Sequence, residues 1–207
     1  MRFIPILFST EMVQAILDGR KTQTRRVVKS NGVIHTARKI VFEDENWQGE
    51  SGRKIKCPYG QPGDVLWLRE TWSDCTDRPD CPAYKAGKDG WEAFHGDLKW
   101  KPSIHMPKAA CRLFLRVKSV RVERLQDIST EDAMVEGIEF SSIRTFPDYK
   151  DYLVKSTKHA EVFHLLNPRL SFQTLWQYIN GEESWNSNPW VWVIEFERIE
   201  KPENFCR

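Results

Sequence analysis

The alternation of hydrophobic and polar positions predicts a mixed α+β protein in which a few short helices interrupt a larger number of strands. The expected strands cover residues 3–8, 25–29, 34–42, 65–72, 110–125 and 190–199. Residues 65–68 are apolar without interruption, which indicates that both faces of that strand are covered. The alternation slips by one position near Lys118 and Ser119, so a β-bulge or a bend is expected there.

Apolar residues at helical spacing predict three helices, over residues 10–18, 131–136 and 168–180. Ser or Thr precedes the first two at positions 9–10 and 129–130, where an N-cap is needed. Each helix ends before a glycine (Gly19, Gly137 and Gly181), the residue that most readily adopts positive φ at a helix C-terminus. The third helix should bury an apolar stripe that includes Ile179.

The remaining segments are interpreted as turns, loops and insertions. Turns or loops are expected at residues 30–32, 43–52 and 185–189. Residues 99–108 contain Pro102 and Pro107 and should form a rigid extended loop rather than a helix. Two segments are expected to be insertions into a single domain of 207 residues: 73–97, with a short strand near Tyr84, and 138–167, partly helical over 148–166.

Composition restricts the partners without identifying one. Hydrophobic residues make up 40% and charged residues 29% of the chain, as in ordinary globular proteins. The formal net charge is only +2, so nucleic-acid binding would need a local basic patch. Nine tryptophans indicate that some line a cleft for a flat ligand, although for any single tryptophan a place in the core is favoured.

Cysteine spacing and hydropathy argue against a metal site, a disulfide framework and a membrane span. The five cysteines include no C-x-x-C pair, so Cys57, Cys75 and Cys81 are expected to be reduced thiols, and neither metal nor cofactor is expected. No apolar run approaches the ~20 residues that cross a bilayer, and Met1 and Arg2 lead into a strand-like segment rather than a secretion signal. We therefore expect a cytoplasmic protein without a membrane partner.

The most distinctive stretch follows the first expected helix. Residues 20–26 contain four cations and two threonine hydroxyls. A cation cluster on a turn that leaves a helix can hold a phosphate or an oxyanion. The simpler alternative is a basic turn that faces water.

The order of residues in and around this stretch resembles that of a known family. Residues 5–28, PILFSTEMVQAILDGRKTQTRRVV, are similar to the opening of the ASCH domain family. The resemblance implies a PUA-like small mixed β-barrel with a few flanking helices, and a link to RNA and modified nucleosides. The family includes small bacterial N(4)-acetylcytidine amidohydrolases, whose G-R-K-T-x-T motif carries a catalytic lysine and threonine. By resemblance these fall on Lys21 and Thr24.

Two further segments extend the resemblance. Residues 125–138, LQDISTEDAMVEGI, are similar to the family's second motif, in which a glutamate completes the catalytic set; that position is Glu136. The segment NPWVWVIEF resembles the closing strand of the family. The longer chain is similar to the phage- and prophage-associated branch, most of whose members have no assigned activity.

Lys21, Thr24 and Glu136 are chemically compatible as a catalytic set. A base must take the proton of a threonine before it becomes a nucleophile, and a lysine is a base when burial or nearby cations lower its pKa. Arg20, Arg25 and Arg26 would supply such cations, and either Arg20 or a backbone N–H an oxyanion site. A carboxylate can orient the lysine or carry a proton to the leaving amine. The simpler interpretation is an ion pair that ties the first loop to the second helix.

The other substrate-binding candidates lie at the end of one strand and in one loop. Besides Arg20 and Arg25, they are Arg69, Glu70, Trp72, Trp100, Ser103 and His105. The end of a buried strand can deliver charged and aromatic side chains to a site, or it can be closed by salt bridges, and both alternatives stay open. A lone histidine in a loop is usually a surface residue, although such loops also carry binding groups.

Three functions remain open at this point. The residue types favour an amidohydrolase that acts on N(4)-acylated cytidine or a similar modified nucleoside or nucleotide. The second is a non-catalytic PUA-like module that binds RNA or single-stranded nucleic acid. The third is a phage accessory protein that uses the same surface for protein contact.

Overall fold

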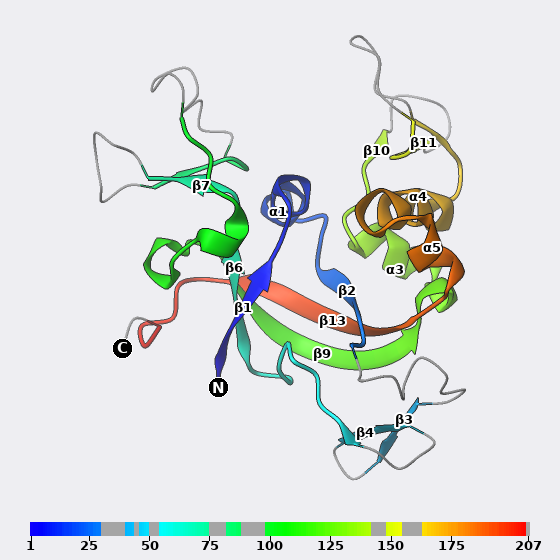
Figure 1. Ribbon diagram of the computed structural model, residues 1–207, viewed down its shortest axis with the longest axis horizontal. Coiled ribbons are helices and arrows are strands. Elements are labelled where there is room, and N and C mark those ends of the chain that lie inside the picture. The colour runs from blue at the N-terminus through cyan, green and yellow to red at the C-terminus, as the bar shows by residue number, and fades with distance from the viewer. Residues whose placement is uncertain are drawn as a thin grey trace. The chain divides into compact units, whose positions relative to one another are not determined.

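A computed structural model describes residues 1–29, 40–43, 46–49, 54–74, 82–87, 98–141, 148–154 and 163–205. The described residues form an α+β fold with short helices and a five-stranded mixed sheet of order β1-β6-β9-β13-β2 (Figure 1). Its strands are β1 (Phe3–Leu7), β6 (Val65–Arg69), β9 (Phe114–Arg124), β13 (Trp190–Ile199) and β2 (Gln23–Val27). The α+β class is confirmed, and the described strands do not close into a barrel.

Two compact units make up the chain, each from discontinuous segments. Unit 1 consists of Met1–Gly19, Tyr59–Ser119 and Phe196–Arg207, and unit 2 of Arg20–Pro58 and Val120–Glu195. The long strands β9 and β13 contribute residues to both units. The expectation of a single domain stays a prediction.

In unit 1, β6 lies between β1, which is parallel to it, and β9, which is antiparallel. Residues 65–68 are all buried, as predicted for a strand covered on both faces. The strand ends at Arg69, earlier than predicted, because the Glu70 backbone N–H contacts Met106 Sδ instead of continuing the ladder. The chain resumes as β7 (Trp72–Ser73), which pairs with β8 (Ala83–Tyr84), the short strand expected near Tyr84.

The first helix of unit 1, α1 (Thr10–Leu17), has the predicted ends. Ser9 caps it by accepting a hydrogen bond from Met12 N, and Gly19 follows with φ +75°. The predicted extended loop is wrong for two stretches, η1 (Ser103–His105) and η2 (Lys108–Ala110), which are 3₁₀ turns. Each begins directly after a proline, whose fixed φ and missing N–H suit the start of a helical turn. Because η2 occupies residues 108–110, β9 begins later than predicted.

In unit 2, β13 pairs antiparallel with β2, from Val191 opposite Val27 to Glu195 opposite Gln23. Its helical segments are η3 (Leu125–Asp127), α3 (Thr130–Val135), α4 (Pro168–Asn180) and α5 (Glu182–Asn186). Helix α4 has the predicted bounds, but Ile179 is 54% exposed, so its place in the buried stripe was predicted wrongly. Helix α5 takes up part of the predicted turn at 185–189. None of the described helices combines the length and apolarity that a bilayer crossing requires.

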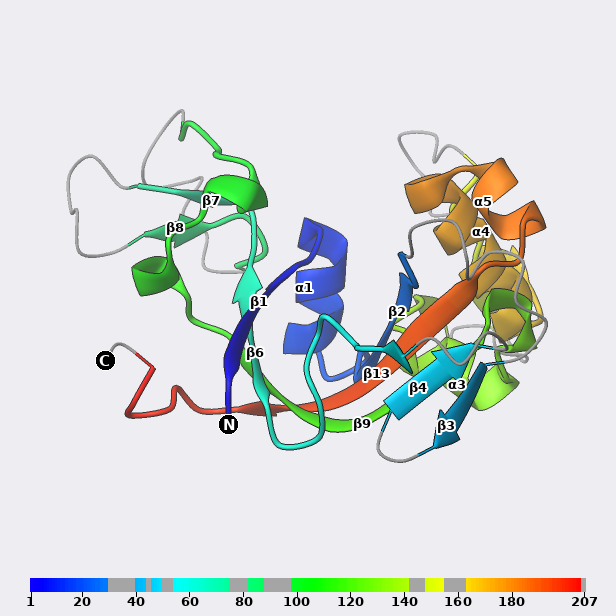
Figure 2. The same ribbon diagram turned by 60° about the horizontal axis from the view of Figure 1, so that its bottom comes forward.

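Two small sheets complete unit 2. They contain β3 (Ile40–Glu43), β4 (Asn46–Gly49) and β5 (Lys54–Ile55), and β10 (Phe140–Ser141), β11 (Asp148–Lys150) and β12 (Phe163–Leu165). Strands β3 and β4 of the first sheet are seen in Figure 2, and β10 and β11 of the second in Figure 1. The loop predicted over 43–52 is wrong where β4 lies, and the helix predicted over 148–166 is wrong at β11 and β12. Strand β11 is anchored on α4, where Ser171 Oγ donates to Lys150 O at 2.7 Å. The turn predicted at 30–32 lies outside the described residues.

Candidate functional site

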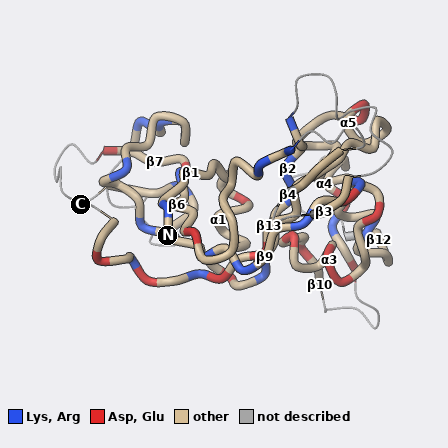
Figure 3. Tube along the Cα trace, turned by 90° about the horizontal axis from the view of Figure 1, so that it is seen from below, with Lys and Arg blue, Asp and Glu red and all other residues tan. Residues whose placement is uncertain are grey.

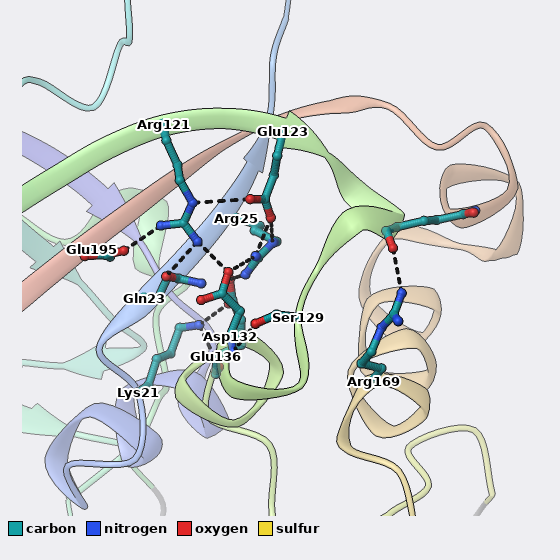
Figure 4. Close-up of polar contacts among 11 residues, drawn as sticks. Lys21, Gln23, Arg25, Arg121, Glu123, Ser129, Asp132, Glu136, Arg169 and Glu195 are labelled. Carbon is teal, nitrogen blue, oxygen red and sulfur yellow. Dashed lines mark hydrogen bonds and ion pairs between the residues drawn. The ribbon is translucent and has the colours of Figure 1, made fainter.

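Lys21 and Glu136 meet in unit 2 through side-chain and backbone contacts (Figure 4). The two residues form an isolated antiparallel β-bridge, and Lys21 Nζ donates to Glu136 Oε2 at 2.8 Å and to Glu136 O at 2.7 Å. The side chains are 2% and 4% exposed. Glu136 is the C-cap of α3, so the lysine ammonium also satisfies a carbonyl at the end of that helix.

The position of Glu136 follows from local signals at both ends of α3. Ser129 Oγ accepts a hydrogen bond from Asp132 N at the N-cap, and Gly137 follows the helix with φ +90°. Both were predicted. A short helix with fixed ends holds its C-cap residue in one direction, and the Glu136 side chain here points toward Lys21 and Arg25 (Figure 4).

The environment of Lys21 lowers the pKa of its ammonium group. Burial lowers the pKa of Lys21, and the contact with Glu136 opposes this only in part. Arg26 and Arg25 act in the same direction as burial because they repel the ammonium. A lysine with a lowered pKa is a better proton acceptor than an ordinary lysine, which is the direction that the sequence-based hypothesis requires.

Arg25 binds three carboxylates within the same buried cluster. Its Nη1 donates to Glu136 Oε1 at 2.9 Å, its Nη2 donates to Asp132 Oδ2 at 2.7 Å, and its Nε and Nη2 both donate to Glu123 Oε1. Burial acts to lower the pKa of Arg25, but Glu136 and Glu123 raise it, so its charge is permanent.

Arg121, on β9, extends the cluster to Glu195 on β13. Its guanidinium donates to Glu195 Oε1 at 2.5 Å, to Glu123 Oε2 at 3.2 Å and to Asp132 Oδ2. It also donates to Gln23 Oε1 at 3.4 Å, whereas Gln23 Nε2 is buried without an acceptor among the described residues. We call these residues the carboxylate network: Lys21, Gln23, Arg25, Arg121, Glu123, Asp132, Glu136 and Glu195.

Arg20 lies beside this network and contacts the turn after α3. Its Nη1 donates to Gly137 O at 2.8 Å and to Ile138 O at 3.4 Å. Because Lys21 and Arg25 are 3% and 4% exposed, the alternative of a basic turn facing water is wrong. The cations also do not share a turn, since Arg25 and Arg26 belong to β2, which begins at Gln23, earlier than predicted.

Thr24 is buried in the middle of β2. Side chains alternate along a strand, so Thr24 lies on the face of β2 opposite to Gln23 and Arg25, which belong to the carboxylate network. Among the described residues, no hydrogen bond joins the Thr24 hydroxyl to Lys21 or Glu136. The structure therefore brings together Lys21 and Glu136 of the predicted set, and the catalytic role of Thr24 stays a prediction.

The other substrate-binding candidates belong to unit 1. The Glu70 carboxylate accepts hydrogen bonds from Arg112 Nε at 2.9 Å and from Arg112 Nη2 at 3.0 Å. This is the salt-bridged strand end that the sequence left open as an alternative. Arg69 donates to Met106 O and Ile104 O. Trp72 is buried under Lys101, whose Nζ lies 5.1 Å from the ring centroid. Trp100 and Ser103 are partly exposed and His105 is exposed, and the substrate-binding roles of all these residues stay predictions.

Sequence reasoning missed five residues of the carboxylate network. They are Gln23, Arg121, Glu123, Asp132 and Glu195. One signal was available, because Arg121 and Glu123 are two positions apart on a predicted strand and so share a face. Glu123 and Arg121 each lie 98 positions along the chain from their respective partners, Arg25 and Gln23. No local sequence pattern indicates such pairings.

The described residues contain no group of three or more His, Cys, Asp or Glu side chains that could hold a metal ion. Cys57 is partly buried, and Cys75 and Cys81 lie outside the described residues. Cys111 is buried, and burial raises the pKa of its thiol to about 11. The expectation that the protein needs no metal stays a prediction.

Comparison of the chain with protein-family models, with curated proteins and with solved structures found no match in any of the three. The resemblance to the ASCH family therefore rests on the motifs of the chain itself.

Proposed function

We propose that this protein is an amidohydrolase of the ASCH type, with a PUA-like fold, that removes the acyl group from N(4)-acylated cytidine or a similar modified nucleoside. The observation that carries the proposal is the buried contact between Lys21 and Glu136, two of the three residues that the resemblance assigns to catalysis. Breaking the amide C–N bond consumes one water and gives the free amine and a carboxylate. Such a reaction needs a base for the nucleophile and an acid for the leaving amine.

Lys21 and Glu136 fit these two needs. Burial lowers the pKa of Lys21, so its neutral amine can take a proton from the Thr24 hydroxyl or from water. Glu136 fixes the lysine in one orientation through Oε2. The protonated lysine can then return the proton to the leaving nitrogen. If Thr24 is the nucleophile, the same lysine takes a proton from the water that hydrolyses the acyl-threonine. Release of the product as a carboxylate sets one proton free.

The test is a chromatographic assay of purified protein with N(4)-acetylcytidine. Cytidine and acetate should form in equal amounts, and Lys21→Met should abolish turnover, because this variant keeps the length of the side chain and removes the amine. Thr22→Val, at an exposed position beside it, is the matched control and should keep wild-type turnover. Absence of cytidine from the wild-type reaction would exclude this substrate.

A second candidate, a non-catalytic module that binds RNA or single-stranded nucleic acid, is supported by one region of unit 1. Lys99, His105 and Lys108 are exposed there, in the same stretch of the chain as the partly exposed Trp100. Basic and acidic residues are otherwise interspersed along the described trace (Figure 3). Few phosphates could be neutralised, so binding to a labelled oligonucleotide should vanish at moderate salt. Tight binding that persists at high salt would favour this candidate over the enzyme.

A further inference from the structure

We propose that Arg25 is a positioning residue for the Lys21–Glu136 pair, holding the Glu136 carboxylate so that one of its oxygens stays directed at Lys21. The inference rests on the proposed function and deepens it, because it gives Arg25 a role in the reaction other than contact with substrate.

The two oxygens of Glu136 are held by two different cations. Arg25 Nη1 donates to Oε1 at 2.9 Å, and Lys21 Nζ donates to Oε2 at 2.8 Å. A carboxylate bound by one partner can rotate about its terminal bond, whereas one bound at each oxygen has a single orientation. Removing Arg25 therefore leaves the Glu136 carboxylate free to rotate, and this carboxylate is the group that orients Lys21.

The Arg25 guanidinium is itself fixed by contacts with several side chains. All three guanidinium nitrogens donate to carboxylates, and the side chain is 0% exposed. The Phe172 ring of α4 lies 5.7 Å from the guanidinium carbon. A guanidinium engaged in this way is placed to hold Glu136 and is poorly placed to bind substrate, which separates this role from the substrate-binding role expected from the sequence.

The charge of Arg25 has a second, measurable effect. The charged groups that face Lys21 are Glu136 from α3 and Arg25 and Arg26 from β2. Arg25 lowers the pKa of Lys21 by repulsion, so its loss should raise that pKa. Arg121 shares Glu123 and Asp132 with Arg25 but does not contact Glu136. It therefore offers a control with the same change of charge in the same carboxylate network.

The experiment compares Arg25→Met, Arg25→Lys and Arg121→Met with the wild type. One arm measures kcat and KM for N(4)-acetylcytidine across pH. The other arm follows the pKa of Lys21 by NMR of the ¹³C-labelled ε-carbon, with the signal assigned by its loss in Lys21→Met, and it needs no turnover. Arg25→Lys keeps a cation beside Lys21 but not the planar fork, and it serves as the second variant if Arg25→Met does not fold.

Arg25→Met should lower kcat by about 10- to 100-fold with little change in KM, as expected when a catalytic group is misplaced. It should also raise the pKa of Lys21. The pH range over which kcat increases should shift to higher pH accordingly. Arg25→Lys should lower kcat while leaving the pKa of Lys21 close to the wild-type value. Arg121→Met, which leaves Glu136 bound by both Arg25 and Lys21, should lower kcat less than Arg25→Met and should change the pKa of Lys21 less.

Three outcomes would overturn the inference. A rise in KM at unchanged kcat in Arg25→Met would indicate substrate binding, and equal losses in Arg25→Met and Arg121→Met would indicate a purely structural role. An unchanged pKa of Lys21 in a folded Arg25→Met protein would show that Arg25 does not act on the pair. If the wild type hydrolyses nothing, the proposed function fails, and the NMR arm alone decides whether Arg25 controls Lys21.

Discussion

The Lys21 Nζ and Glu136 Oε2 atoms lie 2.8 Å apart although the residues are 115 positions apart in the chain. With side chains only 2% and 4% exposed, neither charge is accessible to water to any useful extent. The pair joins the segment before β2 to the end of α3, so it contributes to the structure of unit 2 whether or not it is catalytic. Structural and catalytic roles can be separated by measuring the stability of variants at the two positions as well as their turnover.

Glu136→Gln should destabilise the protein more than Lys21→Met. Glu136 serves two buried cations, and losing one partner of a buried pair costs about 3 kcal/mol or more because the other charge is left uncompensated. After Lys21→Met, by contrast, Glu136 still binds Arg25. Urea denaturation of the three proteins measures the order. A larger loss in Lys21→Met would contradict the contacts described here.

The two ends of the Lys21–Glu136 contact were predictable because local signals produce them. Ser9, Gly19, Ser129 and Gly137 cap or terminate α1 and α3 through hydrogen bonds and φ values that depend on a few neighbouring residues. The contact itself was proposed only from the resemblance to ASCH proteins. Nothing in the spacing of the residues indicates that they meet.

The wrong predictions share a different physical cause. Strand β4 has no alternating apolar pattern and exists because it pairs with β3 on one side and β5 on the other. Strand β11 depends in the same way on β10, β12 and the contact from Ser171. In both cases tertiary pairing outweighs local propensity, which a single sequence does not reveal.

Gly60 offers a test of the packing in unit 1. Its φ is +93°, and a Cβ there would lie 2.9 Å from Asp64 Oδ2 and 2.9 Å from Ile4 Cδ1. Gly63 has a similar φ of +90° but open space around it, so Gly63→Ala is a control for backbone strain alone. Backbone strain should cost each variant about 1–3 kcal/mol. In thermal denaturation, Gly60→Ala should lose more stability than Gly63→Ala. Equal losses would show that the Asp64 side chain moves aside without cost.

Asp64 should contribute to stability in a pH-dependent way. Burial would raise the pKa of its carboxyl, but hydrogen bonds from Arg2 and the Gln61 backbone lower it below the usual value. A lowered folded pKa gives stability that is present above the unfolded pKa, about 3.9, and lost as the pH falls through the folded pKa. The free-energy difference between wild type and Asp64→Asn should therefore be constant from about pH 5 to 7 and shrink below about pH 4.

The control for this prediction is Asp74→Asn. Asp74 pairs with Lys101 at 2.6 Å, but its side chain is 57% exposed, so the pair should contribute little to stability. Urea denaturation between about pH 3 and 7 measures both variants. A difference between wild type and Asp64→Asn that grows toward acid pH would contradict the hydrogen bonds assigned to Asp64.

Thr24 is the residue on which the resemblance and the geometry of β2 differ. The resemblance assigns its hydroxyl to catalysis, whereas strand alternation puts it on the face opposite to Gln23 and Arg25. Catalytic hydrogen bonds are often formed only when substrate is bound, so their absence here does not decide the role.

Thr24→Val decides it, because the variant keeps the shape of the side chain and removes only the hydroxyl. If Thr24 is the nucleophile, turnover of N(4)-acetylcytidine should be lost to the same extent as in Lys21→Met, and the double variant should lose no more, since a nucleophile and its base act as a unit. Substrate binding, measured by calorimetry, should remain nearly unchanged because no charge is removed. Thr22→Val carries the same substitution at an exposed neighbouring position and should behave as wild type. Equal cytidine release by Thr24→Val and wild type would exclude Thr24 as nucleophile and leave Lys21 to activate water directly.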